Sequence, residues 1–388
     1  MEVRRIRDDE KETAYALASL AFMQGSRQIP WADDPNQPKA AAYGVWDERG
    51  FQAQAVVLSF RAHMGPEAVL PLGGIAGVAC KPAARGRGYA RAALLAALRH
   101  MRDEGEVIST LYPFSWRYYQ QLGWEWTGVN RRISAATRIF EPTPDTDRCR
   151  EASRTDRPRI ETVYNRFAGR YRGMLDRDEK KWNTILDDTP EQWTYAYVYE
   201  GDEGIEGYFV YRGGSGETTE LREFICLNSR AQRAMLGLLG RMDMQTKRIR
   251  WTAPSDDLLW SAVCDYDIEV TLCPMTQARV VDVQGAMSQW RPDPDASGRF
   301  AVRIADEHAD WNARTWEVTF ADRQVEIKPT TAEAGLAIHI RTFSQAFFGT
   351  PTPDELRRAD LIHVTDERSF RAFRDCLSGP PMWTNDFF

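Results

Sequence analysis

A turn rich in glycine and arginine follows an apolar strand and opens a helix in the stretch GVACKPAARGRGYARAALLAALRHM, residues 77–101. Gly86 and Gly88 leave backbone N–H groups unshielded by a Cβ, and the start of a helix carries a partial positive charge. Arg85 and Arg87 add two guanidinium groups, which hold phosphate oxygens in pairs. The pattern predicts a phosphate or pyrophosphate site on this turn.

The spacing of the turn disfavours two common nucleotide sites. In the pattern GxGxxG the third glycine would stand at position 91, which is arginine, and no acidic residue for a ribose is well placed downstream. No Gly-Lys-Ser/Thr follows the glycines, which disfavours a P-loop. The alternative without a ligand is an ordinary basic start of a helix.

Charge and composition narrow the class of protein. The 388 residues carry a net charge of −6, which disfavours DNA or RNA as the main partner. The six cysteines form no CxxC pair and no histidine lies at zinc-ligand spacing from them, so we expect neither a metal site nor a disulfide framework. Neither a signal peptide nor a long apolar run is present, so we expect a cytoplasmic protein without a membrane partner.

Three segments with different patterns follow one another along the chain. Residues 1–147 read as α/β, with a first helix near residues 10–23 and a polar linker at residues 141–150. Residues 148–273 read as a second α/β segment. Residues 274–388 read as an α+β domain whose aromatic tail, GPPMWTNDFF, is expected to be tucked into the protein.

The second segment repeats part of the first. An apolar stripe at helical spacing follows a strand in both segments: Ala90, Ala93, Leu94, Ala97, Leu98 and Met101, then Ala231, Ala234, Met235, Leu238, Leu239 and Met242. The second helix opens through Asn228, a good N-cap, and has no glycine turn. We therefore expect a duplicated fold whose second copy does not bind the same ligand.

Two motifs carry a resemblance to a known family. Arg85-x-x-Gly88-x-Ala90 resembles the Q/R-x-x-G-x-G/A pyrophosphate loop of the GNAT N-acetyltransferases, which bind acetyl-coenzyme A. The run from Tyr119 to Trp124, YQQLGW, resembles the family's Y-x-x-F/L-G-F/Y/W turn. The resemblance implies acetyl-CoA as cosubstrate, with no metal, and Tyr119 as the general acid that protonates the leaving thiolate. Tyr118 is the competing candidate for the general acid. The alternative without a catalytic role is that both tyrosines only pack against their neighbours.

The order of the segments resembles the Eis-type (enhanced intracellular survival) acetyltransferases. The resemblance implies an α/β (α+β) fold of tandem GNAT-like domains, the second degenerate, followed by a sterol-carrier-protein-like α+β domain. It implies coenzyme contacts from nine residues at the end of the strand and on the turn: Val78, Ala79, Cys80, Arg85, Gly86, Arg87, Gly88, Tyr89 and Ala90. In that family the terminal carboxylate reaches the active site, which assigns a catalytic role to Phe388.

The acceptor implied by the resemblance is an amine on a small polycation, such as an aminoglycoside or a polyamine. Candidate residues for an acidic, aromatic pocket are Phe22, Trp31, Asp33 (with its neighbour Asp34) and Asp386. A solvated loop is an equally open interpretation of the Asp33-Asp34 pair. The resemblance also implies a homo-hexamer.

Two functions from other classes remain open. One is a carrier, in which the third domain binds an apolar ligand and the first two serve as scaffold. The other is a catalytically inactive acetyl-CoA sensor. Loss of coenzyme binding on changing Arg85 and Gly88 would fit the enzyme and the sensor alike, whereas a change at the C-terminus would affect the enzyme and spare the carrier.

Overall fold

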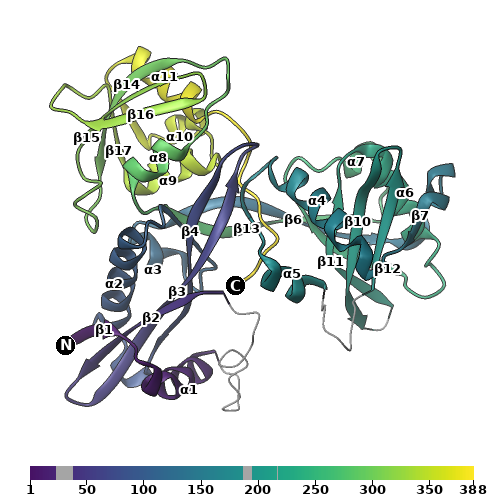
Figure 1. The fold of residues 1–388 in the computed structure, drawn as a ribbon, viewed down its shortest axis with the longest axis horizontal. Helices are drawn as coiled ribbons and strands as arrows, with labels where there is room; N and C mark the ends of the chain where they lie inside the picture. Colours follow the sequence, from purple (N-terminus) through teal and green to yellow (C-terminus); the bar gives the residue numbers. More distant parts are fainter. Residues whose placement is uncertain (23–37, 187–194, 216) are drawn as a thin grey trace. The chain divides into compact units, whose positions relative to one another are not determined.

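The computed structural model describes residues 1–22, 38–186, 195–215 and 217–388, and it divides into two compact units (Figure 1). Unit 1 contains Met1–Thr127, Thr276–Pro380 and Phe387–Phe388, and unit 2 contains Gly128–Met275 and Pro381–Asp386. The first and third predicted segments thus fall largely in one unit. The last eight residues are divided between the two.

Unit 1 begins with a sheet whose strands run in the order β1-β2-β3-β4-β5-β13. Only the β4–β5 pair is parallel, and the other neighbours are antiparallel. The elements are β1 (Glu2–Arg5), α1 (Lys11–Ala21), β2 (Ala40–Asp47), β3 (Gly50–Met64), β4 (Val69–Cys80), α2 (Tyr89–Asp103), β5 (Ile108–Leu111) and α3 (Trp116–Gln120), with β13 (Ile268–Val280) contributed from later in the chain.

Helix α2 packs through the predicted apolar stripe. Its buried members are Ala93, Leu94, Ala97, Leu98 and Met101, which join one hydrophobic core with residues of β2, β3 and β4. Alanine and leucine have high helix propensity, and each buried leucine stabilises the fold by about 1.5–3 kcal/mol. The core therefore fixes the start of α2 beside the end of β4.

The strands of unit 2 run in the order β6-β12-β11-β10-β9-β7. Its elements are β6 (Glu125–Ala136), β7 (Cys149–Glu151), α4 (Arg157–Ala168), β8 (Arg172–Leu175), α5 (Glu179–Leu186), β9 (Ala196–Gly201), β10 (Gly204–Ser215), β11 (Thr218–Cys226), α6 (Ser229–Gly240), β12 (Arg248–Ala253) and α7 (Leu259–Ala262). As with β4 and β5, the strands flanking α6 are parallel: β11 pairs with β12 from Thr218 to Glu220. The predicted duplication is thus visible in the order strand, helix, parallel strand.

The rest of unit 1 is a five-stranded sheet in the order β16-β15-β14-β17-β18, in which only β14 and β17 are parallel neighbours. Its elements are α8 (Val283–Gln289), β14 (Gly298–Ala305), β15 (Thr315–Ala321), β16 (Gln324–Pro329), β17 (Leu336–His339), α9 (Ile340–Phe348), α10 (Pro353–Arg358), β18 (Ile362–Val364) and α11 (Glu367–Leu377). Inward residues of β14 alternate with exposed ones, as expected for a sheet with one covered face.

The predicted linker at residues 141–150 is a packed part of unit 2, so that expectation is wrong. Residues Pro144–Arg148 form a 3-10 helix, and Thr146 is fully buried. A Cβ on Gly237 of α6 would lie 2.9 Å from the Pro142 Cα atom, which shows how closely the segment approaches the helix. The glycine at position 237 therefore leaves room for this segment beside α6.

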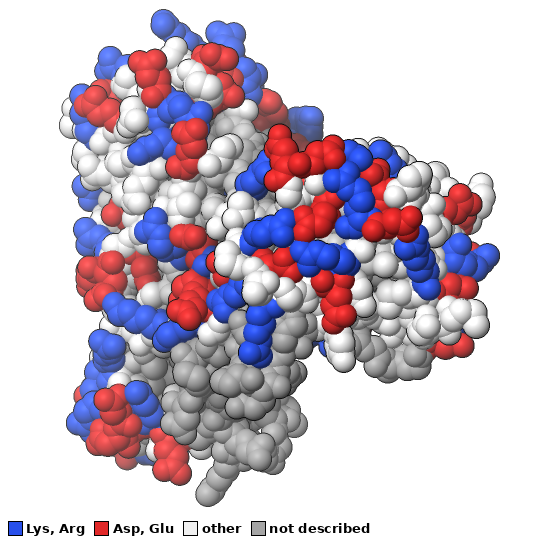
Figure 2. Space-filling view, turned by 45° about the vertical axis from the view of Figure 1, so that its right-hand side comes forward, with Lys and Arg blue, Asp and Glu red and all other residues white. Residues whose placement is uncertain are grey.

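Two bulk expectations can be compared with the structure. On the face drawn in Figure 2, basic and acidic side chains are interspersed. Within the described ranges, no helix is long and apolar enough to cross a membrane.

Candidate active site

The turn before α2 has the open backbone that its glycines predicted. Gly86 and Gly88 have φ angles of +77° and +81°, a region that residues with a Cβ rarely adopt. A Cβ built on either glycine meets no atom within 4 Å. Arg85 and Arg87 are exposed beside them. The turn therefore presents backbone and guanidinium groups to solvent with no side chain in between.

The N-terminus of α2 has no side-chain cap. Gly88 occupies the N-cap position, and the first helical hydrogen bond runs from the Ala92 N–H to the Gly88 carbonyl, at 2.9 Å. The preceding N–H groups of a helix have no partner in the helix itself. Uncapped N–H groups together with two arginines make this turn suited to an anion such as a pyrophosphate.

Tyr89 positions the turn through its hydroxyl. The buried Tyr89 donates a hydrogen bond of 2.6 Å to Asp47 Oδ2 at the end of β2. That bond lowers the pKa of Asp47 and raises the pKa of Tyr89. Ala90, half-buried, packs against the α2 core. Of the predicted loop residues, these two hold the helix start in place, while the four before them face solvent.

β4 has an edge that β5 does not cover. Pairing with β5 ends at Ile75, whereas β4 continues to Cys80. The Lys81 N–H donates to the Gln52 carbonyl of β3, and N–H directions alternate along a strand. The N–H group of Cys80 therefore points away from β3, to the side where none of the described strands pairs with β4, whereas Gly77 and Val78 lie at a shift in the β3–β4 register.

Three residues of β4 were predicted to contact the coenzyme, and their side chains are divided between two hydrophobic cores. Val78 and Cys80 pack against the α2 core, and Ala79 is buried in a small core with Ile6 and Leu17 on the other side. Burial raises the pKa of the Cys80 thiol. Cys80 is therefore protonated near neutral pH and is a poor nucleophile.

Tyr119 lies in the last turn of α3. Its carbonyl oxygen accepts hydrogen bonds from the N–H groups of Leu122 and Trp124, at 2.9 and 3.2 Å. The side chain is 2% exposed and packs edge-on to Tyr118 and Phe114. No partner of the Tyr119 hydroxyl is found among the described residues. Burial raises the pKa of Tyr119, so the phenol stays protonated at neutral pH.

Tyr118 differs from Tyr119 in its surroundings. It is half-buried, and burial followed by the nearby Cys80 raises its pKa. Its ring joins the edge of the α2 core near the end of β4. Both tyrosines are therefore neutral proton donors in the same part of unit 1.

Phe388 has a fitted position on β4. Its ring centroid lies 5.0 Å from that of Phe60 and 5.7 Å from that of Tyr112. A Cβ on Gly74 would lie 2.5 Å from the Phe388 Cε2 atom, so only glycine leaves room for the ring. Gly74 pairs with Thr110, one residue before β4 and β5 stop pairing. The ring thus lies where the two strands begin to diverge.

The aromatic tail is only partly tucked in. Trp383 is 1% exposed and donates from Nε1 to Asn130 Oδ1 at 2.7 Å. Phe387, one of the aromatic residues of the tail that was expected to be tucked into the protein, is 72% exposed and contacts the Tyr112 ring at 4.6 Å between centroids. The expectation of a tucked tail is therefore wrong for Phe387. Its neighbours in sequence, Asp386 and Phe388, make the contacts that hold the tail.

The carboxylate of Asp386 is committed to ion pairs inside unit 2. It accepts from Arg177 Nε at 3.1 Å and from the Tyr164 hydroxyl at 3.1 Å, and Lys181 lies 3.5 Å away. Burial opposes the charge, but Arg177 and Lys181 outweigh it and lower the pKa of Asp386. Asp386 was expected in the acceptor pocket, and that expectation is corrected: its carboxylate anchors the C-terminal tail.

Replacing Asp386 with asparagine is expected to destabilise the fold by on the order of 3 kcal/mol, because Arg177 loses one of its buried partners. Urea unfolding followed by tryptophan fluorescence measures the change. The matched control is Asp202→Asn, whose carboxylate is 70% exposed beside Arg230 and whose loss is expected to cost less than about 1 kcal/mol. Equal effects of the two substitutions would contradict the anchor role.

The other acceptor candidates are less defined. Phe22 is 49% exposed at the end of α1. Trp31 and Asp33, with Asp34, lie outside the described residues.

The second copy closes the corresponding turn with its own side chains. Asn228 Oδ1 accepts from the Ala231 N–H at 2.8 Å, as its N-cap position predicted. Arg230 forms ion pairs with Asp145 and Asp202, and Asn228 also contacts Glu206. Three carboxylates near the start of α6 replace the open glycines of α2, an environment that disfavours phosphate.

Two positions of unit 1 that matter to the site were not predicted. Gly74, which seats Phe388, lies in the strand sequence PLGGIAGVAC, and glycine inside a strand is a signal for close approach of another group. Asp47, the partner of Tyr89, carries no signal in the sequence because the contact spans 42 positions.

Comparison with known proteins agrees with this architecture. Residues 2–127 and residues 173–280 each match an acetyltransferase (GNAT) domain, together more than half of the chain, and residues 283–385 match a sterol carrier protein domain. A comparison with curated protein sequences found no match.

Solved structures share the fold over the whole chain. A GCN5-related N-acetyltransferase from Anabaena variabilis has a TM-score of 0.88 at 17% identity, with 100% of both chains covered. A probable N-acyltransferase from Enterococcus faecalis, described as a conserved protein of unknown function, has a TM-score of 0.85 at 22% identity, with 100% of this chain and 99% of that one covered. Eis1 from Mycobacterium abscessus has a TM-score of 0.80 at 18% identity, with 100% of both covered. The chain is thus a GNAT-family acetyltransferase with the Eis-like order of two GNAT domains and a sterol-carrier-protein-like domain.

Proposed function

We propose that the protein transfers the acetyl group of acetyl-CoA directly to an amine of a small polycation, of the aminoglycoside or polyamine class. One observation carries the proposal: the uncapped Gly86–Gly88 turn opens beside the edge of β4 that β5 leaves unpaired. A coenzyme with a pyrophosphate at one end and a thioester at the other needs both features at once.

The coenzyme's pyrophosphate is assigned to the turn. The N–H groups from Gly86 to Ala90 and the guanidinium groups of Arg85 and Arg87 supply donors and positive charge. The pantetheine arm would then run along β4 past Val78, to the place where the N–H group of Cys80 faces the unpaired side. A donor there polarises the thioester carbonyl and stabilises the oxyanion that forms on it.

The transfer needs a proton donor and an oriented amine. The amine nitrogen attacks the thioester carbon, the C–N bond forms and the C–S bond breaks. Tyr119, held neutral by burial, gives its proton to the departing sulfur. The carboxylate that Phe388 carries orients the amine, directly or through water, and water accepts the ammonium proton. Cys80 takes no covalent part, because its raised pKa keeps it a thiol.

We assign the selection of the amine acceptor to Phe22, Trp31 and Asp33. For Trp31 and Asp33 this assignment rests on the family resemblance alone. A carboxylate beside aromatic walls favours a cationic amine. Asp386 is left out of this set because Arg177 and Lys181 already neutralise it.

The carrier hypothesis is supported less well than the enzyme. Side chains in the third domain contact one another closely: Phe300 packs on Phe320 and Phe373, and Phe347 packs on Phe343 and Trp290. A protein interior filled in this way resembles an ordinary core rather than a lipid tunnel.

The experiment is acetyl-CoA-dependent release of free thiol with a panel of amines: aminoglycosides, polyamines and lysine peptides. Wild type is compared with a variant that carries one extra residue after Phe388, which converts the carboxylate to an amide and moves the charge. Turnover with a polycationic amine, reduced at least tenfold in the extended variant, is the expected result.

The other outcomes separate the rivals. Tight acetyl-CoA binding without turnover on any amine would identify a sensor. Turnover that prefers lysine peptides over every small polycation would overturn the proposed acceptor class and leave the acetyltransferase activity standing. Full activity of the extended variant would remove Phe388 from the mechanism.

A further inference from the structure

The turn that carries Tyr119 has little support of its own. Helix α3 has only five residues, far fewer than an isolated helix needs for stability in water. It ends in a turn at Gly123, whose φ angle is +89°. The N–H groups of Leu122 and Trp124 both donate to the Tyr119 carbonyl. The carbonyls of Gln121 and Leu122, which follow the end of the helix, need hydrogen-bond donors from elsewhere in the chain.

Those partners come from later in the chain. Arg279 Nη1 donates to the Leu122 carbonyl at 2.6 Å, and His308 Nε2 donates to the Gln121 carbonyl at 2.8 Å. Gln121 and Leu122 are two and three positions after Tyr119 in the sequence. The residues after Tyr119 are thus held by β13 and by the loop after β14.

A second side chain of β13 holds the start of α3. Gln277 Nε2 donates to the Trp116 carbonyl at 3.1 Å and to the Trp124 carbonyl at 3.4 Å. Residues two apart on a strand lie on the same face, so Gln277 and Arg279 reach α3 and its turn together. The two side chains bracket the segment from Trp116 to Trp124.

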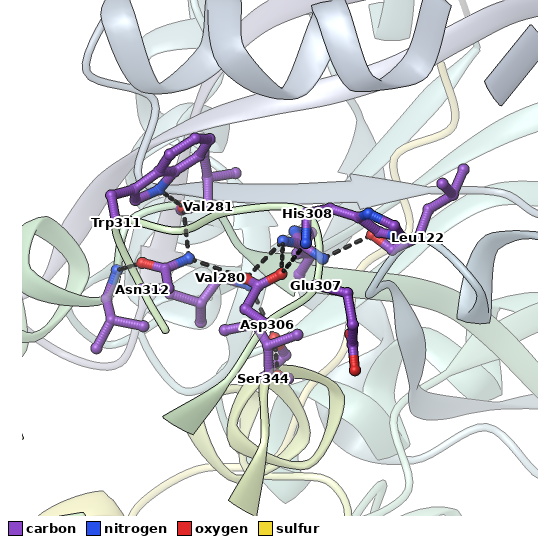
Figure 3. Close-up of polar contacts among 12 residues, drawn as sticks. Leu122, Val280, Val281, Asp306, Glu307, His308, Trp311, Asn312 and Ser344 are labelled. Carbon is purple, nitrogen blue, oxygen red and sulfur yellow. Dashed lines mark hydrogen bonds and ion pairs between the residues drawn. The ribbon is translucent and has the colours of Figure 1, made fainter. Parts of the chain in front are cut away.

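The guanidinium of Arg279 is itself fixed by a buried network around Asp306. Figure 3 shows Asp306 with Asn312 and His308 beside it. Asp306 Oδ1 and Oδ2 accept from Arg279 Nη2 at 2.8 and 2.7 Å, and both side chains are fully buried. Asn312 Nδ2 donates to Asp306 Oδ2 at 3.2 Å and to the Val281 carbonyl at 3.0 Å, and the His308 N–H donates to Asp306 Oδ1 at 3.1 Å. The carboxylate therefore cannot swing, and it holds the guanidinium in one orientation.

The turn and the guanidinium fit each other closely. A Cβ on Gly123 would lie 1.4 Å from Arg279 Nη1 and 3.3 Å from Ile340 Cγ2. Glycine is therefore required at position 123 both by its φ angle and by the guanidinium above it. The glycine of the Tyr119 motif is thus explained by a contact from Arg279 on β13.

We propose that the Arg279–Asp306 ion pair, with Gln277, positions Tyr119 for proton transfer. The inference rests on the role of Tyr119 in the proposed function and adds a task for Asp306, which lies in the sterol-carrier-protein-like segment. A misplacement of about 1 Å in a reacting group costs up to about a hundredfold in rate. A forked guanidinium that spans a carboxylate and a backbone carbonyl restricts the turn more than a single contact does.

The first test is Arg279→Lys. Lysine keeps the charge beside Asp306, but its single ammonium cannot reproduce the planar fork that reaches both Asp306 and the Leu122 carbonyl. We expect kcat to fall roughly tenfold. The KM for acetyl-CoA should stay within about twofold, because the pyrophosphate turn is untouched.

A double-mutant cycle tests whether the effect passes through Tyr119. In the Tyr119→Phe background there is no proton to place, so Arg279→Lys should lower kcat no further. A full additional tenfold loss in that background would overturn the proposal. Wild-type kcat in Tyr119→Phe alone would instead refute the role of Tyr119 in the proposed function.

Two further variants separate positioning from folding. Arg279→Met combined with Asp306→Leu replaces the buried ion pair by apolar groups, which proteins often tolerate without loss of stability. It should stay folded by circular dichroism and still show the lowered kcat. The control Val318→Ala removes a buried third-domain side chain and should lower Tm while kcat stays at the wild-type value. Unchanged kcat in the double variant would contradict the inference.

Discussion

Replacing Gly88 with valine is expected to weaken acetyl-CoA binding by at least a hundredfold, a loss of about 2.7 kcal/mol. The Cβ would project from the N-cap of α2 into the space that the proposed pyrophosphate occupies, which is otherwise empty within 4 Å. A φ angle of +81° adds strain of about 1–2 kcal/mol to the folded protein. Isothermal titration calorimetry with acetyl-CoA measures the affinity, and thermal unfolding measures the strain separately.

The chain supplies a matched control at the other end of the same helix. Gly105 follows α2 with a φ angle of +76°, and a Cβ there also meets no atom within 4 Å. Gly105→Val should lower Tm about as much as Gly88→Val does, because the backbone strain is alike. Its affinity for acetyl-CoA should remain within about twofold of wild type. If both variants bind acetyl-CoA like wild type, the turn is not the coenzyme site.

Local features of the site could be predicted because neighbouring residues determine them. The glycine turn follows from the left-handed backbone that Gly86 and Gly88 permit, and the burial of α2 follows from its helical stripe. The N-cap of α6 follows from Asn228 in the same way. In each case the structure is set within a few residues of the signal.

Distant contacts could not be predicted, and they decide the roles of several residues. Asp386 looks like a free acid in the sequence, but its partner Arg177 lies 209 positions earlier. Arg279 looks like one arginine of many until it meets the Leu122 carbonyl, 157 positions away. The sequence carries the residue types for these contacts, but only the folded chain shows which of them meet.

Replacing Tyr119 with phenylalanine is expected to lower kcat by about a hundredfold or more, in the range that a positioned general acid contributes. The ring keeps its contacts with Tyr118 and Phe114, so the fold should be unchanged. Affinity for acetyl-CoA should stay near the wild-type value, because the hydroxyl serves only the departing sulfur. Stopped-flow or steady-state thiol release with the best acceptor measures the change.

Tyr118→Phe is the matched control, one position away and also protonated. Burial raises the pKa of Tyr118, so both phenols could act as donors by their protonation state alone, and only their positions distinguish them. Tyr118→Phe should keep kcat within about threefold of wild type. A large loss in Tyr118→Phe with little loss in Tyr119→Phe would transfer the role to Tyr118, the residue nearer to Cys80.

The pH dependence provides an independent check on the donor. Because burial raises the pKa of Tyr119 above its ordinary value near 10, the phenol stays protonated as pH rises from 7 to 10. The wild-type kcat should therefore not fall over this interval, and deprotonation of the amine acceptor should make it rise. A donor with a lowered pKa would instead produce a falling limb within this interval. Such a limb, if present in wild type and absent from Tyr119→Phe, would show that the buried phenol loses its proton far more easily than its surroundings indicate.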